Sequence, residues 1–459
     1  MISCGSKGDT RCMLLLAALF FASQAHHAQS AELRGNPSNY RTLLKDIKPG
    51  DTLSLASGVY REGLPLHGIK GTPDRPIRIA GPAVGPPAEF LARAGHNTVS
   101  LSNTAHVHIG RLVLNGDNLE ADAVKAEGHK SCLSVHHMVL EDLLIVGHGV
   151  DQQIVGISSF CPAWNWIIRR NIIVATGTGL YLGNSDGSAP FVGGLIEQNL
   201  VVDTLGYNLQ IKHQLDRPAG IGMPAQRTRT IVRHNLFTKA HNASSGANAR
   251  PNMLAGHFPR QGAGSEDHYE ISHNLFFCSP GESLLQAEGN LTVARNIFIN
   301  PDGDAINIRP HNDVPKTVEV RQNFVAASGK GISVSEAPSS YTQYTQRVTG
   351  NWIFSPAAVT GGTQSGNQVA PFPLAGPSLP QWLDGARDSD VGRSEFAPLL
   401  EIANRVCAPR ADEKRRYPAS IADALRNHPM CQIVKQLSTE AHKAGAPLIT
   451  APAPAPCAI

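Results

Sequence analysis

The segment GYNLQIKHQ ends in a lysine and a histidine, Lys212 and His213, after a stretch in which apolar and polar residues alternate. Alternation with a period of two is typical of a β-strand with one buried face. A lysine on the other face becomes a general base at neutral pH only when burial or a neighbouring cation lowers its pKa. The elements that hold Lys212 therefore decide whether it does chemistry.

Those elements repeat along the chain. An apolar–Asn–apolar unit recurs with spacings of 28, 36, 39, 22, 27 and 28 residues, and each copy is followed by a turn and a second alternating segment. Units that cannot bury an apolar face alone and must stack are typical of a parallel β-helix, in which we expect the recurring Asn side chains to bond from coil to coil. A β-sandwich is the alternative, but it gives no reason for an Asn in every repeat. The repeated residues are Asn171, Asn199, Asn235, Asn274, Asn296, Asn323 and Asn351, with weaker copies near Arg111 and Asp142.

The chain divides into three parts. Residues 1–30 have the basic start, apolar run and small residues of an export signal. Residues 31–358 form the predicted β-helix, which opens within residues 40–62 with a short helix over the exposed end, a PGD turn and a strand. Residues 359–459 read as a Pro-rich linker, a helical extension expected to cover the far end, and a disordered tail.

The cysteines fit an oxidising compartment. Six remain once Cys4 and Cys12 leave with the signal, and they allow fifteen connectivities. We favour the pairs Cys407–Cys431 and Cys132–Cys161. No CxxC or His-x-x-His spacing suggests zinc, and we assign His136, His137 and His148 to structure.

The opening of the β-helix carries a family resemblance. IKPGDTLSLASGVY, then GTPDRPIRIAGP, then the Asn-punctuated coils resemble right-handed parallel β-helix polysaccharide lyases of the alginate lyase and chondroitinase B-like family, over roughly residues 40–352. The resemblance implies an all-β, right-handed parallel β-helix. It also implies an exported lyase that cleaves a uronic-acid polysaccharide by β-elimination.

The family's site residues match only in part. Its base is a Lys in a KS…N…N stretch, which IKHQ…VRHN resembles, with Lys212 at the matching position. Its Arg in an LRHG stretch is missing, because Ala255 and Gly256 stand there with His257 next. Its calcium-binding acids are replaced by Leu205, Tyr207 and Leu209, so we assign no metal and leave a calcium cofactor open.

Stacking the second segments in register predicts two neighbouring columns. Ile211, Ala255, Ala287, Ile308 and Val334 point inward, and the next residues, which point outward, are Lys212, Gly256, Glu288, Arg309 and Ser335. We expect Lys212 to be the base, and Arg309 to lower its pKa and grip a carboxylate. We expect His257 or Tyr207 to donate to the leaving oxygen, and Glu288 to orient Lys212 or bind a cation.

The longest spacings flank Lys212 and His257, and their loops carry Arg217, Arg227, Arg229, Arg250 and Arg260. Insertions gathered on one face of a stack usually build its binding face. A net charge of +3 argues against nucleic acid, and no later segment is long and apolar enough for a membrane anchor. We therefore expect a monomer, secreted or periplasmic, that binds an anionic polysaccharide through Tyr207, Gln210, His213, Arg217, Arg250, Arg260 and Glu288.

Two other functions stay open. A β-helix glycoside hydrolase needs two carboxylates at a set separation, for which the chain offers Glu288 with Asp186 and Asp304 at strand ends. A non-catalytic carbohydrate-binding or surface protein would keep the basic loops and tolerate the loss of Lys212.

Overall fold

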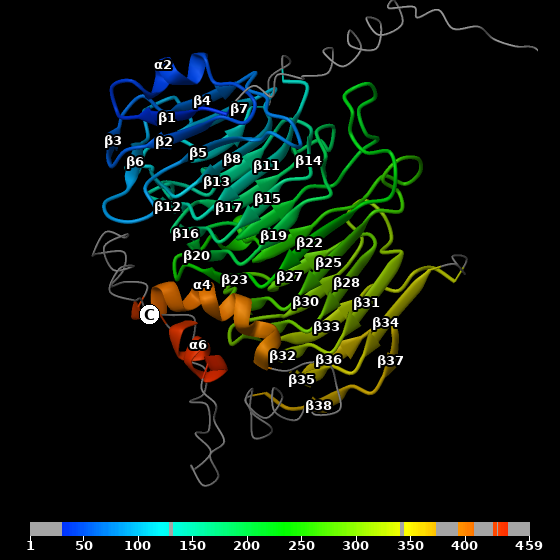
Figure 1. Ribbon diagram of the computed structural model, residues 1–459. Coiled ribbons are helices and arrows are strands. Elements are labelled where there is room, and N and C mark those ends of the chain that lie inside the picture. Colours follow the sequence, from blue (N-terminus) through cyan, green and yellow to red (C-terminus); the bar gives the residue numbers. More distant parts are fainter. Residues whose placement is uncertain are drawn as a thin grey trace, which may run out of the picture.

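Three long parallel sheets form the molecule. The computed structural model describes residues 30–127, 132–339, 344–372, 393–407, 426–428 and 430–438. Successive laps of the chain add one strand to each sheet, and every pairing between the strands named below is parallel (Figure 1). The predicted all-β, right-handed parallel β-helix is therefore confirmed.

Sheet A has fifteen strands and is flanked along its outer face by arginine, glutamate and histidine side chains. Its strands are β1 (Glu32–Gly35), β2 (Thr52–Leu55), β5 (Ile77–Ala80), β8 (Ala105–Gly110), β11 (Val135–Glu141), β14 (Ala163–Trp164), β15 (Ile167–Arg169), β18 (Phe191–Val192), β19 (Leu195–Glu197), β22 (Arg229–Arg233), β25 (His268–Ser272), β28 (Leu291–Ala294), β31 (Thr317–Arg321), β34 (Thr345–Thr349) and β37 (Thr363–Ser365).

Sheet B has twelve strands, and most of its middle strands are buried on both faces. Its strands are β3 (Gly58–Tyr60), β6 (Ala88–Leu91), β9 (Leu112–Asn115), β12 (Leu144–Val146), β16 (Ile172–Val174), β20 (Leu200–Thr204), β23 (Leu236–Lys239), β26 (Leu275–Phe277), β29 (Ile297–Asn300), β32 (Phe324–Ala327), β35 (Trp352–Phe354) and β38 (Gln368–Ala370).

Sheet C has eleven strands and carries the Lys212 segment. Its strands are β4 (Leu64–His67), β7 (Val99–Ser102), β10 (Val124–Ala126), β13 (Val155–Ser159), β17 (Thr178–Leu182), β21 (Leu209–Ile211), β24 (Met253–Ala255), β27 (Leu285–Ala287), β30 (Ile306–Ile308), β33 (Lys330–Val334) and β36 (Ala357–Thr360). Its register pairs Ile211, Ala255, Ala287, Ile308 and Val334, all buried in the core, so the predicted inward column is confirmed.

An asparagine ladder joins the coils between sheets A and B. From Asn171 to Asn367, each Nδ2 donates to the Oδ1 of the Asn one lap on, at 2.9–3.1 Å. The backbone N–H of each Asn donates to the same oxygen. The predicted ladder is confirmed, with one correction. Asp142 is in register with Arg170, and Leu143 takes the ladder position and donates its N–H to Asn171.

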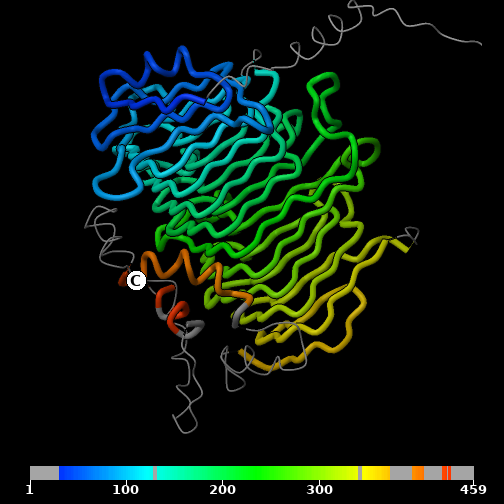
Figure 2. Tube along the Cα trace, viewed as in Figure 1, coloured from blue at the N-terminus to red at the C-terminus, as the bar shows by residue number. Residues whose placement is uncertain are grey.

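The N-terminal end is closed as predicted. Helix α2 (Tyr40–Lys45) buries Tyr40 and Leu44 in the core at the blue end of the stack (Figure 2). The Tyr40 ring lies edge-on to Tyr60 and Phe90. Gly50 turns the chain at φ +94° between α2 and β2, where the PGD turn was predicted.

The C-terminal helices within the described residues lie against the side of the stack, not over its far end as expected. Helices α4 (Ala397–Cys407) and α6 (Met430–Ser438), with a 3-10 turn at Arg393–Phe396, pack on the outer face of sheet B (Figure 1). Apolar residues on that face, from Val113 to Phe354, form one cluster with the apolar side of the amphipathic α4. The coils also continue through β38, past the boundary predicted at residue 358.

Both favoured disulfides are present: Cys132–Cys161 and Cys407–Cys431, which links α4 to α6. The predicted signal segment, most of the Pro-rich linker and the tail lie outside the described residues. No helix in the described part of the chain is long and apolar enough to cross a membrane.

The ladder predicts a position-dependent loss of stability. Asn235→Ala leaves the buried N–H and side-chain amide of Asn199 without their acceptor, which should lower the free energy of unfolding by roughly 2–5 kcal/mol. Asn367→Ala, at the partly exposed last coil, should cost about 1 kcal/mol or less, because water can replace the lost bonds. Urea unfolding measures both, and equal losses would contradict a ladder that works through burial.

Candidate active site

The outer face of sheet C carries two adjacent columns of side chains. The Tyr181 column lies within the strands and consists of Tyr181, Gln210, Leu254, Gln286 and Asn307. The Lys212 column follows the strand ends and consists of Lys212, Gly256, Glu288, Arg309 and Ser335, whose backbone N–H groups bond to the preceding lap. The predicted register therefore holds, and the two columns share one face.

Lys212 is half-buried beside an aromatic ring. Its Nζ lies 5.7 Å from the centre of the Tyr181 ring, and its stem packs against Gly183. Burial is the main cause that lowers the pKa of Lys212; the positive charge of Arg250 lowers it further, and Glu288 opposes both. A lysine whose pKa is lowered in this way offers a larger neutral fraction as a base.

The cation beside Lys212 is Arg250, not the predicted Arg309. Arg309 is exposed and lies three laps from Lys212, or ~14 Å along the stack at the usual strand spacing of ~4.8 Å. Arg250 comes from the loop between β23 and β24, and its guanidinium carbon lies 6.0 Å from the centre of the Tyr207 ring. Its Nη1 donates to the carbonyls of Ala247 and Ala249, which fix the side chain over this face.

The two tyrosines keep their hydroxyl protons. Burial raises the pKa of Tyr181 to about 12 and also raises the pKa of Tyr207. Neutral hydroxyls beside Lys212 and Arg250 are potential proton donors at neutral pH. Tyr207 was predicted from the sequence, but Tyr181 was missed. It stands one lap before Gln210 in the segment GLYLGN, so extending the predicted column by one coil would have found it.

A second lysine, Lys239, also escaped sequence reasoning. It ends β23, is 5% exposed, and donates from Nζ to the carbonyl of Arg250 at 2.7 Å. Burial, with Arg250 as a second cause, lowers its pKa to about 7. Its segment LFTK is buried along its whole length and has no regular alternation, so nothing in the pattern marked it. Lys239 holds in place the loop that carries Arg250.

Gln210 lies in the floor of the site. It is 4% exposed between Tyr181 and Leu254 in its column. Gln286, two laps on, is 7% exposed and donates to Glu282. The substrate contact of Gln210 stays a prediction, and burial leaves only a small part of this side chain open to a ligand.

A hollow of about 870 Å³ opens beside the end of the Lys212 segment. His213, His257 and Arg260 line it, together with Asn312. The Nε2 of His257 lies 3.3 Å from Asp313, which is also 3.6 Å from Arg260. Burial lowers the pKa of His257 although Asp313 opposes it, so the ring is mainly neutral at pH 7. The Arg260 side chain is 72% exposed at the rim.

Glu288 holds this hollow in shape. Its buried carboxylate accepts the backbone N–H groups of His311 and Asn312, which position the neighbouring Asp313. Its charge raises the pKa of Lys212, and its oxygens accept hydrogen bonds from the loop. The stack is tight at Gly256, the next position of the Lys212 column. A Cβ on Gly256 would lie 2.3 Å from the backbone nitrogen of His213, so a larger residue does not fit there.

The loop arginines do not all face the site. Arg217 is buried in an ion pair with Asp267 and donates to the carbonyl of Gln226, so it ties its loop together. Arg227 and Arg229 line the outer face of sheet A. Among the predicted arginines, Arg250, Arg260 and Arg309 remain on the sheet C side, where their charges favour an anionic ligand.

The fold and this face define a parallel β-helix with a candidate active site on sheet C. No protein-family model and no curated protein matches the chain. Solved structures similar to it include a PL6 family alginate lyase, at 13% identity and a TM-score of 0.36, over 74% of this chain and 53% of that one. An alginate lyase from Paenibacillus sp. gives 16% and 0.37, over 75% and 96%. A GH136 lacto-N-biosidase from Eubacterium ramulus gives 12% and 0.47, over 79% and 71%.

These structures include the group that the opening motif resembles. The chain spans about half the length of the first of them. At identities and scores this low, the likeness assigns neither a reaction nor a substrate to this chain.

Lys239 predicts a pH-dependent stability. Its folded pKa of about 7 lies below the ordinary lysine value, so between these values the unfolded chain binds a proton that the folded chain does not. The free energy of unfolding should therefore rise from pH 7 to pH 9, by up to about 2 kcal/mol more in the native protein than in Lys239→Met. Urea unfolding across this range measures the difference. The exposed Lys330→Met is the matched control and should keep the native slope; a native slope in Lys239→Met would contradict the buried amine.

Proposed function

We propose that this protein is an exported polysaccharide lyase that cleaves a uronic-acid-containing polysaccharide by β-elimination, with Lys212 as the base. The observation that carries the proposal is the Lys212 amine, half-buried over the Tyr181 ring with its pKa lowered by burial and by Arg250. β-Elimination needs a base near the working pH and a cation for the carboxylate whose α-proton is removed.

In this reaction Lys212 takes the proton from C5 of the uronic acid. The C5–H electron pair forms the C4–C5 double bond, the C4–O4 bond breaks, and Tyr207 protonates the leaving oxygen. Arg250 grips the carboxylate and stabilises the negative charge that develops on it. His213, His257, Arg260 and Arg309 bind neighbouring sugars along the face, and Glu288 supports them through its loop.

The compartment belongs to the same proposal. Uronic-acid polysaccharides lie outside the cytoplasm. The two disulfides between described cysteines also suit an oxidising environment. We therefore place the protein in the periplasm or outside the cell.

The test is ultraviolet absorbance during incubation with alginate, pectate, polyglucuronate and glycosaminoglycans, because elimination leaves a conjugated double bond and hydrolysis does not. We expect a rise with one polymer, at least ~10³-fold slower in Lys212→Met and unchanged in the control Lys330→Met. New reducing ends without absorbance would indicate the hydrolase instead. Binding without either product would indicate the non-catalytic carbohydrate-binding protein.

The charge of Arg250 gives a signed pH prediction. The neutral form of Lys212 is the active base, so the rate rises as pH passes through its pKa, and Arg250 lowers that pKa. Arg250→Gln should therefore move the midpoint of the pH–kcat/KM profile upward. Arg250→Lys keeps the charge and should keep the midpoint while lowering the rate, because the two-pronged grip is lost. A midpoint that stays fixed in Arg250→Gln would contradict the tuning of Lys212 by Arg250.

A further inference from the structure

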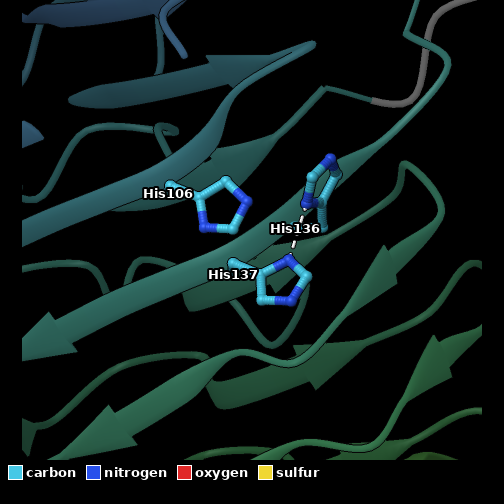
Figure 3. A group of neighbouring side chains, drawn as sticks. All are labelled: His106, His136 and His137. Atoms are coloured by element: carbon cyan, nitrogen blue, oxygen red, sulfur yellow. Dashed lines mark hydrogen bonds between the residues drawn. The ribbon is translucent and has the colours of Figure 1, made fainter. Parts of the chain in front are cut away.

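Three histidines meet on sheet A, away from the Lys212 face. His106 lies in β8, and His136 and His137 lie in β11 (Figure 3). Each offers one ring nitrogen, and these three atoms all lie within 4.8 Å of one another. Within the described part of the chain, no other group of three His, Cys, Asp or Glu side chains is arranged in this way.

A bend in the coil produces the cluster. His106 and His137 have left-handed backbones, with φ +53° and +52°, and Asn165 and Gly193 continue the same column at +55° and +62°. In an extended strand, neighbours such as His136 and His137 would point to opposite faces. The left-handed residue breaks that alternation and brings both rings to one side. Sequence reasoning assigned His136 and His137 to structure and did not single out His106, because the bend leaves no pattern in the sequence.

The rings are held by their surroundings. His106 and His137 stack at 4.4 Å between ring centres, and His136 stacks on Trp164 at 4.3 Å. These contacts hold the three rings close together, and neutral imidazole binds a metal through a ring-nitrogen lone pair.

The Nδ1 atoms of His136 and His137 face one another across a hydrogen bond. The Nδ1 atoms of His136 and His137 lie 2.8 Å apart, and Asn165 lies 3.0 Å from the Nε2 of His137. One shared proton holds the Nδ1 pair together when no cation is present. With a cation between the two rings, that proton moves to Nε2 of His137. Asn165 then turns its amide oxygen inward and accepts a hydrogen bond from this N–H.

We propose that His106, His136 and His137 form a binding site for one divalent transition-metal ion of the zinc class. Ligand atoms at ~2.0–2.1 Å from zinc stand ~3.3 Å apart at a tetrahedral angle. The Nδ1 pair therefore opens by ~0.5 Å while the third nitrogen moves inward. A ligand set of neutral imidazoles favours zinc, copper or nickel over calcium or magnesium, which prefer oxygen.

The site differs from a closed structural zinc site. Three protein ligands leave the fourth position to water or an exogenous ligand. The charge of Lys70 also acts on His136, and it opposes a dication. The affinity should therefore be limited by Lys70. The proposal does not depend on the reaction at Lys212, which lies on another sheet.

Titration of the full-length, chelator-treated and tag-free protein with Zn²⁺ tests the site by calorimetry, and Co²⁺ absorption reports the coordination geometry. We expect one ion per chain, and an affinity at least ~10-fold lower in His106→Asn and in His137→Asn. Asn suits both positions because it tolerates a left-handed backbone and already occupies the column at Asn165. Lys70→Gln should instead tighten binding.

The control is His234→Asn, also at a left-handed position. His234 stacks on His273, but Glu395 already bonds to both rings, so zinc affinity should stay unchanged. Folding of each variant is checked by circular dichroism without metal, and His136→Gln replaces any variant that does not fold. No stoichiometric binding in the native protein, or equal binding in native protein and the His106 and His137 variants, would overturn the proposal.

Discussion

The asparagine ladder is the interaction on which the rest of the structure depends. A parallel stack has no turn between paired strands to set its register, and a slip of one residue would reverse every side chain. Each ladder Asn ties its own amide and backbone N–H to the same oxygen one lap on. From Asn171 to Asn351 these side chains have no exposure, so their bonds are costly to break and hold the register of the laps that they join. The Lys212 column is a consequence of that register.

The candidate site carries a second constraint, because it holds two lysine amines in partly or fully buried positions where the charged form is poorly solvated. Lys212 and Lys239 both have lowered pKa values, and burial is the first cause in each. Buried polar side chains hold the loops around the site. Lys239 bonds to the backbone of Arg250, and Glu288 bonds to the loop that places Asp313 beside His257. A rigid β-helix therefore serves as a platform on which inserted loops place charge.

The sequence predicted whatever follows from periodicity. The Asn spacing and the alternation gave the fold, the ladder, the inward column of sheet C and the outward position of Lys212. The long loops predicted a binding face on the side of sheet C, where residues of these loops line a hollow. It did not predict which loop arginine would turn inward, since Arg217 and Arg250 have similar neighbours, yet one is buried against Asp267 and the other lies over Tyr207. Such choices depend on partners distant in sequence, as do the side packing of α4 and the bend that gathers His106 and His137.

The proposal that Lys212 acts as a base requires burial and Arg250 to lower the pKa of its amine. Titration of that amine measures this pKa directly. Nuclear magnetic resonance of ¹³C-labelled lysine side chains, with the Lys212 signal assigned through Lys212→Arg, follows that single amine through pH. We expect Lys212 to titrate below an exposed lysine such as Lys330, and its pKa to rise in Arg250→Gln. A Lys212 that titrates with the exposed lysines, and does not respond to Arg250, would contradict the proposal.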